Sequence, residues 1–110
     1  MTLVVTLVDD LMDRSRITAV ASDAVAAQSP EAAEDADVVV LDLGRHAGAL
    51  AQVREQAPDA FIVAFGRHDD VAALEAARAA GADRVLTRAR FFADVAGAID
   101  RSADDQPSDQ

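Results

Sequence analysis

Short runs rich in valine, leucine and isoleucine alternate along this chain with alanine-rich stretches that have helical apolar spacing. Nearly every residue in the stronger runs is apolar, a pattern typical of parallel strands that are covered on both faces. Alternation of such strands with helices predicts a parallel sheet with helices on both faces and right-handed crossovers. The predicted strands span residues 3–8, 24–28, 37–43, 60–65 and 84–87.

The stretches between these runs carry residues that start and stop helices. The predicted helices span residues 10–23, 29–36, 46–57, 70–80 and 92–99. Ser29 and Pro30 favour a helix start, Gly44 is expected to end the third strand, and Gly81 favours a left-handed helix end. Five strands and five helices in 110 residues predict an α/β, flavodoxin-like, doubly wound sheet with strand order 2-1-3-4-5.

Composition excludes several classes of function. The chain has no cysteine, so it has no disulfides, zinc–thiolate sites or thiol catalysis. A net charge of −10 argues against nucleic acid and anionic membranes as partners. The N-terminal apolar run is far shorter than the ~20 residues of a membrane span, and no basic segment precedes it, so we expect a cytoplasmic protein.

The chain reads as one domain with a short tail. Residues 1–101 carry all the predicted strands and helices, whereas residues 102–110 hold one alanine among polar and acidic residues. We therefore expect a single domain over 1–101, a disordered acidic tail over 102–110, and no output domain.

Three carboxylates follow two strands that should be neighbours in this fold. Asp9 and Asp10 follow the first strand, and Asp42 lies at the end of the third. Ligands of open α/β sheets bind beyond the carboxyl ends of the strands where the winding reverses, which here is between strands one and three. Clustered carboxylates repel one another, and a hard cation such as Mg²⁺ would neutralise them. We expect weak Mg²⁺ binding there; alternatively, each aspartate only caps the following helix.

Three segments resemble the receiver domain of two-component response regulators. They are LVDD at residues 7–10, VVLDL at 39–43 and AGADRVL at 80–86, and the resemblance covers residues 3–101. It implies that Asp9 and Asp10 hold Mg²⁺, and that Asp42 accepts a phosphoryl group from a histidine kinase.

The chain departs from the receiver pattern at two switch positions. The hydroxyl residue at the end of strand four is replaced by Gly66, and the lysine after strand five by Arg88; there is no lysine in the chain. The chain therefore resembles an atypical form, the pseudo-receiver. A guanidinium grips carboxylates through a planar fork, so we expect Arg88 to pair with Asp42 and hold the domain in one conformation.

Two histidines fall on loops near the predicted site. His46 and His68 could join Asp42 in a transition-metal site, because imidazole and carboxylate together suit Zn²⁺ or Mn²⁺. The alternative is that both are ordinary solvated loop residues.

The last strand and helix offer a surface for self-association. Arg84, Arg88 and Arg90 lie near Asp94 and Asp100 in the sequence. Across a two-fold axis these charges would form reciprocal salt bridges, so we expect a homodimer at high concentration.

Three functions are compatible with these features. The leading hypothesis is a stand-alone receiver-like signalling module that is not an enzyme and acts through contacts with a histidine kinase or another signalling protein. The second is a working single-domain response regulator phosphorylated on Asp42 with Mg²⁺. The third is a small ligand-binding protein using the flavodoxin-like crevice. No glycine-rich phosphate loop follows the first strand, and no nucleophile triad is evident.

Overall fold

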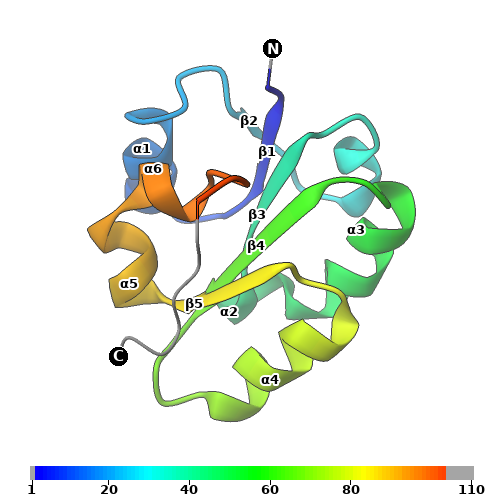
Figure 1. Cartoon of the computed structure of the whole chain (residues 1–110), viewed down its shortest axis with the longest axis vertical. Coiled ribbons are helices and arrows are strands. Elements are labelled where there is room, and N and C mark those ends of the chain that lie inside the picture. The colour runs from blue at the N-terminus through cyan, green and yellow to red at the C-terminus, as the bar shows by residue number, and fades with distance from the viewer. Residues whose placement is uncertain (1, 104–110) are drawn as a thin grey trace.

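A computed structural model describes residues 2–103, which form a five-stranded parallel sheet (Figure 1). The strand order is β2-β1-β3-β4-β5, which confirms the predicted fold class and winding. β3 lies at the centre, with Val39 beside Val5 of β1 on one side and Ile62 of β4 on the other. The strands are β1 (Val4–Leu7), β2 (Val25–Ala26), β3 (Val38–Asp42), β4 (Phe61–Gly66) and β5 (Arg84–Thr87).

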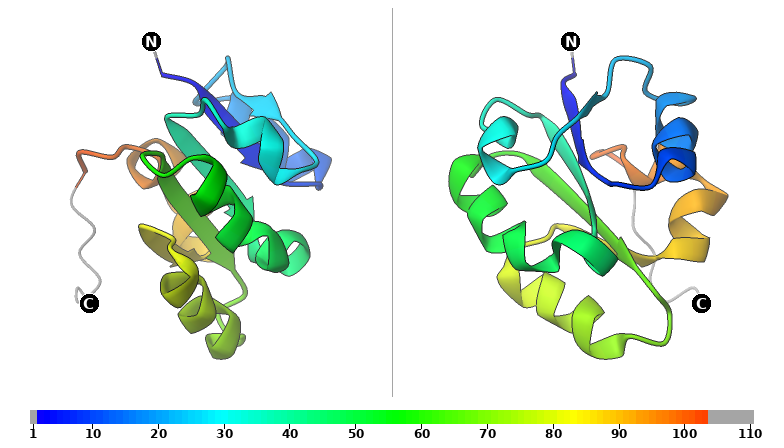
Figure 2. Two further views of the ribbon diagram at one scale, coloured as in Figure 1. Left: turned by 90° about the vertical axis from the view of Figure 1, so that its right-hand side faces the viewer. Right: turned by 180° about the vertical axis from the view of Figure 1, so that it is seen from behind.

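Helices cover both faces of the sheet (Figures 1 and 2). On one side lie η1 (Pro30–Ala33), α2 (Leu43–His46), η2 (Ala47–Ala49), α3 (Leu50–Gln56) and α4 (Val71–Ala80). On the other side lie α1 (Leu11–Thr18), α5 (Arg88–Ala93) and α6 (Val95–Ala98). η1 and η2 are short 3₁₀ helices.

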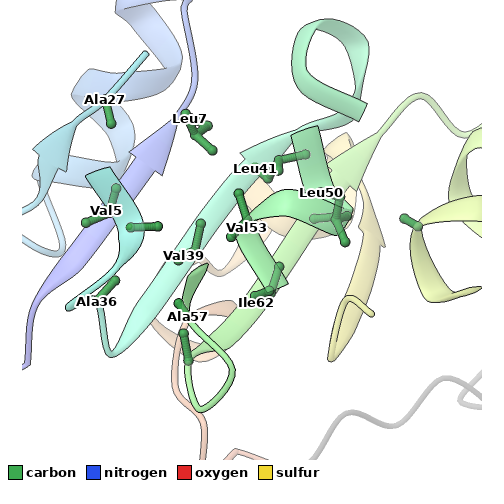
Figure 3. Packing of buried hydrophobic residues seen from close by; sticks show 14 of the residues in the cluster. Val5, Leu7, Ala27, Ala36, Val39, Leu41, Leu50, Val53, Ala57 and Ile62 are labelled. Carbon is green, nitrogen blue, oxygen red and sulfur yellow. The ribbon is translucent and has the colours of Figure 1, made fainter. Parts of the chain in front are cut away.

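Alternate residues of each strand enter two separate hydrophobic clusters. Successive side chains of a strand point to opposite faces, so Val39 and Leu41 of β3 pack toward α3, whereas Val38 and Val40 pack toward α1, α5 and α6. Figure 3 shows the first cluster, in which Leu50, Val53 and Ala57 of the α3 region lie over Val39, Leu41 and Ile62.

The second cluster contains the aromatic residues. Phe65 stacks on Phe91 with ring centroids 4.7 Å apart, and Phe92 packs edge-on against both rings at 5.2 and 4.8 Å. These three rings fill the space between β4 and α5 and give this alanine-rich chain its bulkiest packing.

Several local boundaries differ from the sequence prediction. The helix predicted over residues 10–23 ends at Thr18, and the one predicted over 29–36 is the 3₁₀ helix Pro30–Ala33, in which Ser29 makes no side-chain cap bond. The predicted closing helix is divided at Asp94, whose backbone is not helical and whose carboxylate accepts a hydrogen bond from the Gly97 N–H, so that α6 begins at the next residue.

The end of the third strand is also different. Gly44 does not end it; β3 stops at Asp42, and α2 begins at the next residue with Gly44 inside it. The Asp42 carboxylate causes this abrupt transition, because it accepts a hydrogen bond from the Gly44 N–H and so caps α2.

The described chain continues past the predicted domain end at residue 101. Arg84 is buried and donates to the carbonyls of Ala98, Asp100 and Ala103 at 2.9, 3.1 and 2.6 Å. These bonds attach residues 98–103 to β5. Of the tail predicted to be disordered, residues 104–110 lie outside the described residues.

Gly81 tests how far one glycine stabilises this fold. It ends α4 with φ of +115°, and a Cβ there would lie 3.1 Å from Cγ of Arg54. We expect Gly81→Ala to lower the free energy of unfolding by about 1–3 kcal/mol, because an L-residue is strained at this φ. Chemical denaturation measures the change.

The matched control is Gly48→Ala. A Cβ at Gly48 would meet no atom within 4 Å, and its φ lies outside the left-handed region. The unfolding free energy should stay the same or rise slightly. An equal loss in both variants would contradict the role given to Gly81.

Candidate functional site

The carboxyl edge of the sheet contains a small acidic pocket where the strand order reverses. Its volume is about 260 Å³, and it lies beyond the ends of β1 and β3. Asp9, Asp10 and Asp42 all line it, at the place the fold rule predicts. The other lining residues are Asp13, Arg45 and Arg88.

Asp42 is nearly buried and is fixed by its own helix. The residue is 8% exposed, and its Oδ1 accepts the Gly44 N–H at 2.9 Å. A Cβ on Gly44 would lie only 3.2 Å from that oxygen, so glycine allows the backbone to approach the carboxylate. One oxygen of Asp42 therefore has a structural role, in a residue that also lines the pocket.

The two aspartates after β1 have different partners. Asp10 caps α1, since its Oδ1 accepts the backbone N–H of Asp13 at 3.0 Å. Oδ1 of Asp9 lies 2.8 Å from Nε2 of His46. This hydrogen bond lowers the pKa of Asp9 below the usual carboxyl value, because it stabilises the ionised form.

Arg88 does not pair with Asp42, so that prediction is wrong. Its Nη2 donates to both carboxylate oxygens of Asp13, each at 3.0 Å. The Asp13 side chain is 6% exposed, and such a dehydrated carboxylate requires a charged partner. Arg88 supplies it.

Sequence reasoning missed Asp13 altogether. The available signal was its position three residues after Asp10, in the first turn of the helix that begins at the predicted site. An acidic residue there is ordinarily assigned to the helix dipole. Only the folded chain shows that Arg88, 75 residues further along, reaches the same point.

The pocket supplies hard oxygen ligands but does not gather them around one point. Among residues 2–103, no three aspartate, glutamate or histidine side chains are close enough together to hold a metal ion. Asp9, Asp10 and Asp42 thus share a pocket without forming a ready three-carboxylate site. Mg²⁺ commonly binds through one or two carboxylates and water, and this donor set fits that mode only.

Gly66 is enclosed by apolar side chains. A Cβ at this position would lie 3.2 Å from Cδ1 and 3.3 Å from Cβ of Leu43, and 3.5 Å from Leu74. The early start of α2 places Leu43 over the end of β4. The residue type at position 66 therefore depends on the residue that follows Asp42.

The two histidines have different surroundings. His46 is half-buried and is the last residue of α2, not a loop residue as predicted; it contacts Asp9 rather than Asp42 and is not itself among the lining residues. His68 is exposed and is not among the lining residues. The proposed transition-metal site of His46, His68 and Asp42 is therefore not formed among the described residues.

Two of the three arginines expected at a dimer interface are used within the chain. Arg84 is buried and donates hydrogen bonds to backbone carbonyls between residues 97 and 103, and Arg88 binds Asp13. Arg84 also lies over the ring of Phe61 at 4.8 Å. The reciprocal salt bridges predicted from these residues are therefore not supported.

Comparisons with known proteins identify the fold. No family model matches the chain, and no curated protein matches it. A response regulator from Burkholderia pseudomallei, solved with a phosphorylated aspartic acid, calcium ion and citrate, has a TM-score of 0.77 and 15% identity over 92% of this chain and 68% of that one.

Two further structures agree. The CheY-like protein TadZ from Pseudomonas aeruginosa PAO1 has a TM-score of 0.71 and 20% identity over 88% of this chain and 95% of its own. The beryllofluoride-activated NtrC4 receiver domain dimer has a TM-score of 0.68 and 21% identity over 90% and 97%. The chain therefore has the fold of response regulator receiver domains, as the sequence motifs indicated.

The Asp9–His46 contact predicts a pH dependence. The lowered pKa of Asp9 stabilises the fold above the unfolded carboxyl value, and this contribution is lost as pH falls through the folded value. We expect His46→Ala to raise the pKa of Asp9, measured by NMR titration of its carboxyl carbon. The stabilities of the two proteins should converge once Asp9 is protonated.

Asp69 is the internal control for this titration. Its pKa is lowered by the Arg67 guanidinium, away from the pocket, so His46→Ala should not change it. An unaltered Asp9 pKa in the variant would show that the imidazole contact is not formed in solution.

Proposed function

We propose that this chain is a receiver-like signalling module that acts through protein–protein contacts and whose phosphorylation chemistry is degraded. The fold and the acidic pocket at its switch point support a response-regulator role. We assign it no catalytic turnover of its own.

The observation that carries the degraded chemistry is the packing around Gly66. In the receiver family a hydroxyl stands at this position, where it would bond a phosphoryl group on the acceptor aspartate. Here the position bears no side chain, and Leu43 fills the space beside it. Asp42, which pairs across the sheet with the residue before Gly66, therefore lacks that hydrogen-bond donor.

A working phosphoacceptor is the second candidate. Asp42 lines the pocket with Asp9 and Asp10, and its Oδ2 makes no hydrogen bond to any residue of the segment 2–103. Asp9 or Asp10, with water, would hold Mg²⁺, and the ion would offset the carboxylate charge and bind phosphoryl oxygens. The calcium ion of the Burkholderia neighbour is in keeping with a divalent cation at such a pocket.

The proposed partners are proteins. A histidine kinase or another signalling protein fits the receiver fold, and the NtrC4 neighbour is described as a dimer. No helix within residues 2–103 is long and apolar enough to span a bilayer. We place the module in the cytoplasm, where such kinases present their phosphoryl groups.

Treatment with a small phosphodonor separates the two candidates. We incubate the wild-type protein and Asp42→Asn with acetyl phosphate and Mg²⁺, and record intact masses. Degraded chemistry predicts no mass increment of one phosphoryl group in either protein. An increment in the wild type that is absent from Asp42→Asn would establish the working phosphoacceptor instead.

The contact between Leu43 and position 66 predicts that the two residues are energetically coupled. Gly66→Thr should lower the unfolding free energy by about 1–3 kcal/mol, because the buried Leu43 would have to shift to admit the new side chain. In the Leu43→Ala background the same substitution should cost clearly less. Chemical denaturation of the four proteins in this cycle gives the coupling; an equal cost in both backgrounds would contradict the packing argument.

A further inference from the structure

We propose that Asp13 is a positioning residue that holds Arg88 away from Asp42, so that an oxyanion entering the acidic pocket must compete with the Asp13 carboxylate for this guanidinium. This proposal rests on the proposed function, because it concerns how oxyanion binding in the same acidic pocket is controlled.

The ion pair is well formed and unequal in exposure. Both carboxylate oxygens of Asp13 lie 3.0 Å from Nη2 of Arg88. The Asp13 side chain is 6% exposed, whereas that of Arg88 is 40% exposed. Asp13 is therefore fixed in the protein, and the partly solvated arginine is the member of the pair that can move.

Aromatic rings support the arginine in its present position. The Arg88 guanidinium carbon lies 5.4 Å from the ring centre of Phe65 and 5.3 Å from that of Phe92. A cation over an aromatic ring is attracted by the ring quadrupole. These contacts favour the Asp13-bound position and leave the residue at the pocket wall.

Asp13 is held in place by the residue that begins its helix. Its backbone N–H donates to Oδ1 of Asp10, the cap of α1, at 3.0 Å. Asp10 also lines the pocket. The position of Asp13 is thus tied to the pocket wall, and this arrangement determines where the Arg88 guanidinium is held.

The consequence is a pocket in which one of the two guanidinium groups is already bound. Four aspartates and two arginines line it. The guanidinium of Arg88 donates its hydrogen bonds to Asp13. A planar guanidinium binds tetrahedral oxyanions such as phosphate through paired N–H donors. Releasing Arg88 from Asp13 would supply those donors to the pocket.

The test is a double-mutant cycle with inorganic phosphate as the probe. The four proteins are wild type, Asp13→Asn, Arg88→Gln and the double variant. Phosphate is titrated at constant ionic strength while the amide signals of Gly44 and Gly66 are followed by NMR. Asp13→Asn keeps the shape of the side chain and removes its charge.

The cycle separates release of Arg88 from a simple change in charge. With Arg88 present, Asp13→Asn should strengthen phosphate binding about tenfold, the value of one charge-assisted hydrogen bond. With Gln at position 88, only the general electrostatic effect of about twofold should remain. Equal ratios in the two backgrounds, or no gain in Asp13→Asn, would overturn the proposal.

A further NMR signal and a replacement variant keep the result unambiguous. The side-chain Nε–H signal of Arg88 should shift in Asp13→Asn before phosphate is added, and an unchanged signal would also count against the proposal. If the amide NMR spectrum of Asp13→Asn shows that this variant is unfolded, Asp13→Ser replaces it in the cycle. Phosphorylation of wild-type Asp42 by acetyl phosphate would overturn the degraded chemistry, while the binding ratios would still decide the role of Asp13.

Discussion

Burial of a parallel sheet on both faces is the constraint on which this structure depends. Parallel strands need crossover helices, and the helices cover the sheet on either side. The central strand β3 is buried along its whole length. Its alternate residues belong to two different hydrophobic clusters, one on each face of the sheet. Because all the strands run the same way, their polar ends meet at one edge, where Asp9, Asp10 and Asp42 share a pocket.

The polar groups at that edge are satisfied locally. Asp10 and Asp42 each cap the helix that follows them, Asp9 pairs with His46, and Asp13 with Arg88. The aspartates therefore stabilise the strand-to-helix turns and also form the acidic pocket. This double role explains how a cluster of like charges is tolerated without any three of them meeting around one point in the described chain.

Two departures from the receiver pattern lie at this edge of the sheet. α2 starts immediately after Asp42, which places Leu43 against Gly66, so a Cβ at this position would lie 3.2 Å from Cδ1 and 3.3 Å from Cβ of Leu43. Arg88, at the usual lysine position, binds a buried aspartate of α1 rather than the strand-three carboxylate. Gly66 ends the strand next to β3, Arg88 lines the same pocket as Asp42, and the strand order is that of the receiver fold.

The sheet, its strand order and the meeting of Asp9, Asp10 and Asp42 at one edge were predictable from the sequence, because they follow from apolar periodicity and chain direction. The helix end at Gly81 was predictable because glycine readily adopts the left-handed conformation. Which side chains pair at that edge could be seen only in the folded chain. Arg88 and Asp13 are 75 residues apart, and their contact depends on the packing of α1 against α5. Periodicity fixes which face a residue occupies, but the partner of a long, flexible arginine depends on which carboxylate is buried within its reach.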